Sequence, residues 1–352
     1  MDRMHAPAGK NDPVKYFIEA LNKRAEIEII LGDIASAERD LHDAMKYTRK
    51  ARIMEMFYSA LLTLSNIYEM RGEYDRYRAV TERALKGCRK IEYNDGLAHA
   101  ISNKAIMSGN AGNISRAIEL YREALAIYRK EKAPEKAAVI LINISTNYMF
   151  SGDLKNMKAY AVKAMLDAEK SGNMIIKAMA LEATGLFYKK NKDPATGLRF
   201  FFEALAIREK INDAESMAMG CHQIGHTYLV MKKYGKALEY LNRALDICLS
   251  LGNLQGLSAI FHNLGEVFRR MGKHDKAVYY YRKTIEIDLK LGNPQRSVGH
   301  MMELCDLLLI IKEPGDAMKV AEKALKLSLK NTKDLIDTIR DKISQIKNYS
   351  SK

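Results

Sequence analysis

The chain is poor in the residues that mark secreted, disulfide-linked or membrane-spanning proteins. It has no tryptophan, six prolines and four cysteines in 352 residues. The cysteines lie far apart and form no Cys-x-x-Cys pair, which indicates free thiols in a reducing compartment. The first 11 residues lack the apolar segment of a signal peptide, and the longest notable apolar run, Leu307 to Ile311, is too short to cross a bilayer. We therefore expect a cytoplasmic protein without a membrane segment.

The sequence also lacks the motifs of common catalytic sites. It contains no glycine-rich phosphate loop, no nucleophile elbow and no Cys/His catalytic arrangement, so we predict no enzymatic activity and no cofactor. The net charge of +14 is compatible with an acidic partner, but the 57 basic and 43 acidic residues are interspersed rather than grouped in blocks. No regular base-reading code is visible, so we do not expect nucleic acid to be the partner.

What the sequence does contain is a repeat with a period of 40 residues. One column of the repeat holds a small residue in all eight copies, and another holds glycine or lysine twelve positions earlier. The first column is Ala44, Ala84, Ala124, Ala164, Ala204, Ala244, Thr284 and Ala324, and the second is Gly32, Gly72, Gly112, Gly152, Lys192, Lys232, Gly272 and Lys312. A fixed period of this size predicts an array of stacked supersecondary units.

Each unit divides into two helical patterns, A and B, joined by a turn near the second column. A small residue seven positions before the turn and an aromatic residue four before it lie on one face of helix A, as in Gly265 and Phe268. Prolines start the helices: Pro134 and Pro294 in helix A, Pro194 and Pro314 in helix B. We predict a disordered head at residues 1–12, eight units over 13–330 with turns near 32, 72, 112, 152, 192, 232, 272 and 312, and a capping helix and tail at 331–352.

These columns resemble the tetratricopeptide repeat signature. In repeat seven the pattern is complete except at its last position, where threonine replaces alanine: Leu264, Gly265, Phe268, Gly272, Ala277, Tyr281 and Thr284. The 40-residue period resembles the variant in kinesin light chains and Leu-Gly-Asn repeat proteins, and bacterial peptide receptors use similar arrays. The resemblance implies an all-α, right-handed superhelical solenoid of eight helix-turn-helix units plus a C-terminal capping helix. It also implies that a protein or peptide binds in the groove lined by the A helices.

By this resemblance, the position nine before the turn faces the groove. It holds Asn103, Asn143 and Asn263, with Gln223 in repeat six. An amide side chain has both a donor and an acceptor, so it can pair with the backbone of a ligand of any sequence. The alternative is that these amides cap neighbouring helices or bind water.

The densest group of polar groove residues lies in repeats six and seven. His222 and His226 are four residues apart on one helix, and His262 and Glu266 occupy the equivalent positions on the next. These four side chains could close a tetrahedral zinc site. We favour the interpretation that they contact the side chains of a ligand, and predict no resident metal.

Two further features describe the ligand. Lys189, Lys190, Arg269 and Arg270 form a basic edge, which could bind an acidic partner or could only stabilise helix C-termini. The groove of repeat four is apolar and includes Ile142 and Phe150. Together these features favour an acidic or amphipathic peptide.

The sequence thus predicts a non-enzymatic scaffold or adaptor that binds a peptide segment of a partner in its groove. One alternative is a regulatory sensor whose array changes shape on binding a small signalling peptide. A more remote one is a metal-binding activity at His222, His226, His262 and Glu266.

Overall fold

The computed structural model describes residues 13–331 and 335–350, so the predicted head at 1–12 lies outside the described residues. The described residues form seventeen α-helices and no strand. The helices are α1 (Pro13–Leu31), α2 (Ile34–Ala51), α3 (Met54–Met70), α4 (Tyr74–Lys90), α5 (Asn94–Asn110), α6 (Ile114–Lys130), α7 (Pro134–Ser151), α8 (Leu154–Ser171), α9 (Met174–Lys190), α10 (Pro194–Lys210), α11 (Ala214–Val230), α12 (Tyr234–Leu251), α13 (Leu254–Arg270), α14 (His274–Lys290), α15 (Pro294–Ile310), α16 (Pro314–Asn331) and α17 (Ile336–Ser350).

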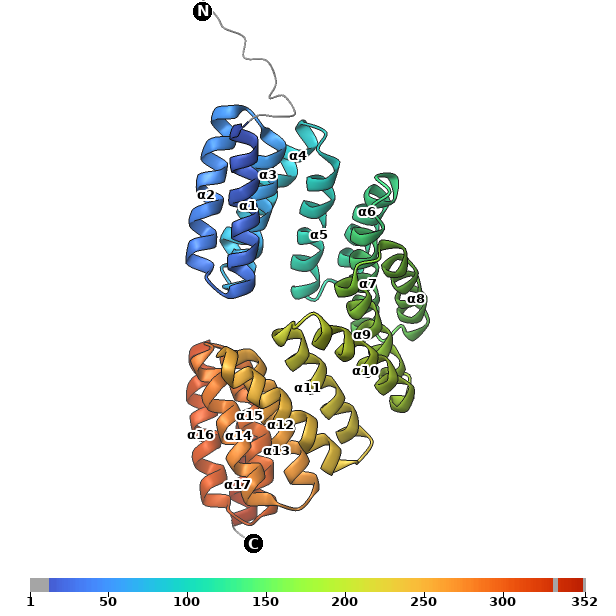
Figure 1. Ribbon diagram of the computed structural model, residues 1–352. Coiled ribbons are helices and arrows are strands. Elements are labelled where there is room, and N and C mark those ends of the chain that lie inside the picture. The colour runs from blue at the N-terminus through green and yellow to red at the C-terminus, as the bar shows by residue number, and fades with distance from the viewer. Residues whose placement is uncertain (1–12, 332–334, 351–352) are drawn as a thin grey trace, which may run out of the picture. The chain divides into compact units, whose positions relative to one another are not determined.

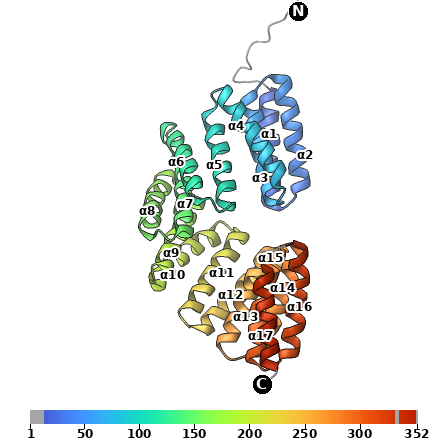
Figure 2. The same ribbon diagram turned by 180° about the vertical axis from the view of Figure 1, so that it is seen from behind.

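The helices form two compact units, Met1–Ala183 and Thr184–Lys352, which divide within α9. In the first unit, helix pairs such as α1 and α2 or α7 and α8 pack side by side in chain order (Figure 1). In the second unit, α11 pairs with α12, α13 with α14 and α15 with α16 (Figure 2). Odd-numbered helices from α1 to α15 are the predicted A helices, even-numbered helices from α2 to α16 are the B helices, and α17 lies in the segment predicted as the capping helix. The all-α fold of consecutive helix pairs is therefore confirmed.

The A–B turns have the same backbone conformation whether glycine or lysine stands there. Gly72 has a φ of 71° and Lys232 a φ of 59°, so both lie in the left-handed region. After each of them, the next backbone N–H donates to a carbonyl five residues back: Glu73 to Tyr68 and Lys233 to Tyr228, both at 2.9 Å. This bond closes the end of helix A and directs the chain into helix B. Lysine occupies a conformation that glycine adopts at lower cost.

The small-residue columns lie in the core. The alanines from Ala44 to Ala324 that share one register are at most 1% exposed, and so is Thr284. On helix A, Ser65 and Ala105 are fully buried, and a methyl group on Gly265 would lie 2.8 Å from the ring of Tyr281. The small column therefore brings neighbouring helices close together, as the periodicity predicts.

Helix ends follow local rules. Pro134, Pro194, Pro294 and Pro314 each stand at the first residue of a helix, which confirms the positions predicted from sequence. Asn113, Asp153 and Asn253 accept backbone N–H bonds from the first turn of the helix that follows.

The last helix, α17, covers the end of the second unit. Ile339 and Ile346 are fully buried in a core shared with α15 and α16, while Asp337 and Arg340 face solvent. The four cysteines are free and buried. In the part of the chain that the structure covers, no helix combines the length and apolar character needed to cross a membrane.

Candidate functional site

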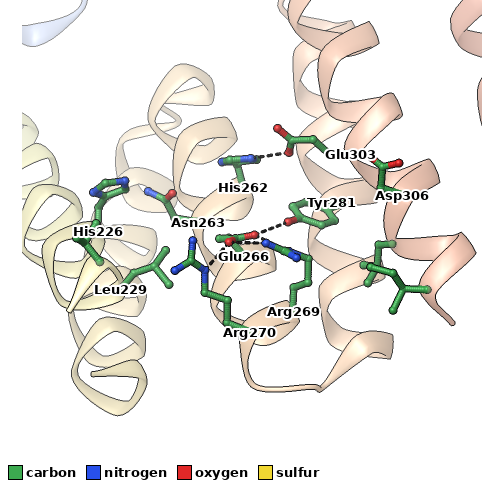
Figure 3. A pocket seen from close by; sticks show the side chains of 13 residues that line it. His226, Leu229, His262, Asn263, Glu266, Arg269, Arg270, Tyr281, Glu303 and Asp306 are labelled. Carbon is green, nitrogen blue, oxygen red and sulfur yellow. Dashed lines mark hydrogen bonds and ion pairs between the residues drawn. The ribbon is translucent and has the colours of Figure 1, made fainter. Parts of the chain in front are cut away.

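The A helices of the second unit line a cavity of about 470 Å³. α11, α13 and α15 supply all of its lining residues except Tyr281, which comes from α14 (Figure 3). The lining combines acidic, basic and apolar groups: His226, Leu229, Val230, His262, Asn263, Glu266, Arg269, Arg270, Tyr281, Glu303, Asp306, Leu307 and Ile310. Most of its α13 residues are three or four positions apart, which places them on one face of that helix.

Glu266 is the centre of a hydrogen-bonded group on this face. Arg269 donates two bonds to its carboxylate at 2.7 and 2.8 Å, Arg270 donates one at 2.5 Å, and the hydroxyl of Tyr281 donates one at 3.0 Å (Figure 3). Burial alone would raise the pKa of Glu266, but these donors lower it to about 2. Both arginines, predicted to bind acidic groups of a ligand, thus have a carboxylate partner within the chain, and their side chains are 40% exposed.

His262 pairs with a residue of the next A helix. Its Nε2 lies 2.8 Å from Oε2 of Glu303 on α15 (Figure 3). The hydrogen bond to His262 lowers the pKa of the Glu303 carboxyl. The ring of His262 also packs on the ring of His300, with centroids 4.8 Å apart.

His300 is in turn held by Asp288, a fully buried residue of α14. Nδ1 of His300 lies 2.6 Å from Oδ2 of Asp288, and the hydroxyl of Ser258 donates to Oδ1 at 2.6 Å. Because a carboxylate only accepts, Nδ1 of His300 carries a proton, and in the neutral ring its Nε2 keeps a lone pair. Burial lowers the pKa of His300, although the bond to Asp288 opposes the change.

His222 and His226 have different surroundings from His262. Nε2 of His222 lies 2.7 Å from Nδ2 of Asn263, a bond that joins α11 to α13. Burial, followed by the nearby charge of Lys189, lowers the pKa of both histidines to about 4. Nδ1 of His226 is buried and has no hydrogen-bond partner among the described residues.

In the predicted basic edge, Lys189 is partly buried, whereas Lys190 is exposed. The ammonium of Lys189 donates to Oε1 of Gln223 at 2.8 Å, so two predicted site residues contact each other. Burial, together with Lys190, lowers the pKa of Lys189 to about 8. Lys190 itself is exposed.

The predicted residues of the first unit differ in how accessible they are. Asn103 is 2% exposed, and its Nδ2 donates to the hydroxyl of Ser65 at 2.8 Å on the preceding A helix. Asn143 is partly exposed and Ile142 is 8% exposed. Phe150 is 69% exposed and is available for an apolar contact.

The four-residue zinc cluster considered from sequence is not present. His222 pairs with Asn263, His262 with Glu303, and Glu266 with two arginines, because neighbouring A helices turn these side chains toward different partners. Across residues 13–331 and 335–350, the one group of three side chains that could hold a metal ion is His262, His300 and Glu303.

Four residues at this site were not predicted from the sequence: Glu303, Asp306, His300 and Asp288. The repeat carried a signal for two of them, because Glu303 follows Asn263 and Asp306 follows Glu266 at a spacing of 40. His300 and Asp288 stand at positions of the repeat where the preceding copies have Ile260 and Cys248. Only the packing of α14 against α15 reveals that pair.

Comparisons with known proteins agree with this architecture. Tetratricopeptide repeat models match residues 97–131 and 216–290. A signal transduction ATPase with numerous domains and a tetratricopeptide repeat sensor, from Pyrococcus horikoshii, aligns over 96% of this chain and 50% of its own, with 18% identity and a TM-score of 0.67. A Rap protein complexed with Competence and Sporulation Factor aligns over 95% and 98%, with 14% identity and a TM-score of 0.66.

A third similar structure is aspartyl phosphate phosphatase F from Bacillus subtilis, over 98% and 96% of the two chains, with 15% identity and a TM-score of 0.53. The chain spans about half the length of the ATPase. A comparison with curated proteins gives no match. The two matched segments are tetratricopeptide repeats, and the chain has the fold of tetratricopeptide repeat proteins.

Proposed function

We propose that the protein is a non-enzymatic interaction scaffold that binds a peptide segment of a partner protein in the groove of its second unit. The observation that carries this proposal is the cavity on the faces of α11, α13 and α15. A concave surface that combines apolar area with a few convergent polar groups is typical of a binding site.

The lining of the cavity favours an amphipathic peptide with an acidic group. Val230 and Ile310 are 48% and 57% exposed, so they offer apolar contacts at the cavity. Arg269 and Arg270 use some of their donors on Glu266 and keep others for a ligand carboxylate.

The similar structures support binding of a peptide or protein as a class of function. One of them is a Rap protein complexed with Competence and Sporulation Factor. In the same unit, Asn263 and Gln223 are the residues that we propose for contacts with the ligand backbone, and Asn143 of the first unit is proposed for the same role in the groove of that unit. The alternative function, a sensor that changes shape on binding a small signalling peptide, uses the same surface and gains support from the sensor in the Pyrococcus protein.

The test is the affinity of a peptide for variants inside and outside the cavity. Peptides would be selected from a displayed library on the purified full chain, and the dissociation constant of the best one measured by fluorescence anisotropy. We expect Val230→Asp and Ile310→Asp each to weaken binding at least about tenfold, because each places a carboxylate on an apolar contact.

Leu249→Asp is the matched control, because Leu249 is as exposed as Ile310, at 57%, and lies outside the cavity on α12. It should leave the dissociation constant unchanged. Equal affinities for all three variants and the wild type would mean that the cavity is not the binding surface.

A further inference from the structure

We propose that His262, His300 and Glu303 form a binding site for a divalent transition-metal ion of the zinc class, with Asp288 as the residue that orients His300. The site lies between α13 and α15 at the wall of the cavity, which His262 and Glu303 line. The inference goes beyond peptide binding and does not depend on it.

The geometry of the three side chains carries the proposal. The ligand atoms that they offer all lie within 4.8 Å of one another, although they come from two different helices. His300 and Glu303 are three residues apart on α15, a spacing that puts both on one face of the helix. His262 reaches them from α13, and its Nε2 already lies 2.8 Å from Oε2 of Glu303 (Figure 3).

Asp288 is the carboxylate that orients the ring of His300. Metal-binding histidines usually donate their other ring N–H to a carboxylate, which fixes the ring and its tautomer. Nδ1 of His300 has this partner at 2.6 Å, and Asp288 is itself fixed by the hydroxyl of Ser258. The lone pair of Nε2 of His300 is therefore available to an ion.

The type of ligand indicates the type of ion. Two imidazoles and one carboxylate suit zinc and similar divalent ions better than magnesium or calcium, which prefer oxygen ligands alone. Three protein ligands leave a coordination position for water or for a group of a bound molecule.

Binding requires release of the proton through which Nε2 of His262 donates to Glu303, together with a movement of the ligand atoms, which now lie within 4.8 Å of one another. In a tetrahedral zinc site the ligand atoms are roughly 3.3 Å apart, given bonds of about 2.0–2.1 Å. Nε2 of His262 and Oε2 of Glu303 must therefore separate by about 0.5 Å from their hydrogen-bonded distance of 2.8 Å. The side chains of His262 and Glu303 are 30% and 49% exposed, so they have room to move.

The test is titration of the metal-free full chain with Zn²⁺ by calorimetry, with Co²⁺ absorption as a report on the coordination geometry. We expect one ion per chain. His262→Ala and Glu303→Gln should each lower the affinity about 100-fold or more, and Asp288→Asn should lower it about 10–100-fold while the ligands stay in place. Circular dichroism would check that each variant is folded, and the two ligand variants at partly exposed positions keep the test valid if Asp288→Asn does not fold.

His226→Ala and His42→Ala are the control variants, one at the same cavity and one on α2, and both should bind zinc as the wild type does. The absence of zinc uptake would overturn the proposal, and so would equal affinity in His262→Ala and the wild type. Loss of binding in His226→Ala with retention in Glu303→Gln would overturn it too, because the ion would then belong to other histidines.

Discussion

Individual histidines of α11 show how burial determines the chemistry of the site. His222 and His226 face Lys189 and Lys190 of α9 and His262 of α13, so their protonation is opposed by burial and by neighbouring positive charge. Their pKa values fall to about 4, well below the usual value near 6.5. Both rings are therefore neutral at neutral pH, and each can accept a hydrogen bond there.

The low pKa values of His222 and His226 in the folded chain make the stability of the second unit sensitive to acid. Above pH 6.5 the two histidines are neutral in the folded and the unfolded chain, so they do not contribute to the pH dependence. Between about pH 6.5 and 4 the unfolded chain binds protons that the folded chain does not, so the free energy of unfolding decreases as the pH falls. We expect the melting temperature of the wild type to fall over this range, and to fall less in the His222→Gln/His226→Gln double variant.

Differential scanning calorimetry from pH 7 to pH 4.5 would measure the effect. His42→Gln, a change at an exposed side chain on α2, is the control and should follow the wild type. If the double variant loses stability in parallel with the wild type, the acid sensitivity has another origin.

At the scale of the helices, the close approach of A and B helices depends on small residues. A methyl group on Gly225 of α11 would lie 2.8 Å from Cγ of Leu241 and 3.2 Å from the carbonyl oxygen of Ala237, both on α12. The helix pair cannot accept it without moving apart. Gly225→Ala should therefore lower the free energy of unfolding by about 1–3 kcal/mol.

Gly299→Ala is the matched control within α15. A methyl group there meets no atom within 4 Å, so the substitution should be stabilising by up to about 1 kcal/mol through helix propensity. Urea denaturation of the two variants and the wild type would measure both effects. A stabilising Gly225→Ala would show that the helix pair is not closely packed at this residue.

At the scale of the whole molecule, the helices of each unit pack mainly on helices one or two places away along the chain. Stability in such an array is transmitted from neighbour to neighbour. Ile339 of α17 is fully buried against α15 and α16. Ile339→Asp should therefore unfold the end of the array without affecting its beginning.

Hydrogen exchange would measure this change helix by helix. We expect faster exchange in α15, α16 and α17 and unchanged exchange in α1 to α4, because a buried carboxylate without a partner destabilises only the core around it. Tyr349→Asp changes a position of α17 that is 44% exposed, so it should leave hydrogen exchange unchanged in both groups of helices. Uniform loss of protection over all described helices would contradict stability that is transmitted from one helix to the next.

Most of the fold could be predicted from the sequence, whereas only part of the candidate site could. The repeat located the A helices, and with them His226, His262, Glu266, Arg269 and Arg270, all of which line the cavity. Glu303 and Asp306 occupy the same positions of the repeat one copy later, where the preceding copy has Asn263 and Glu266. They were not predicted as site residues because the residue type at each position differs. His300 and Asp288 stand at positions where the preceding repeat has Ile260 and Cys248, so the repeat gives no indication of a site there.

The helix pairs and the core follow from the amino-acid sequence, because a period of 40 residues with small residues in fixed columns can be buried in only one register. The partner of each polar side chain depends on how the helices pack. Asn103 bonds to Ser65, Arg269 to Glu266, and His262 to Glu303 rather than to the neighbouring histidines of α11. The physical reason is that periodicity places a residue on a face of its helix, while its contacts depend on how neighbouring helices are rotated and on the rotamer that packing permits.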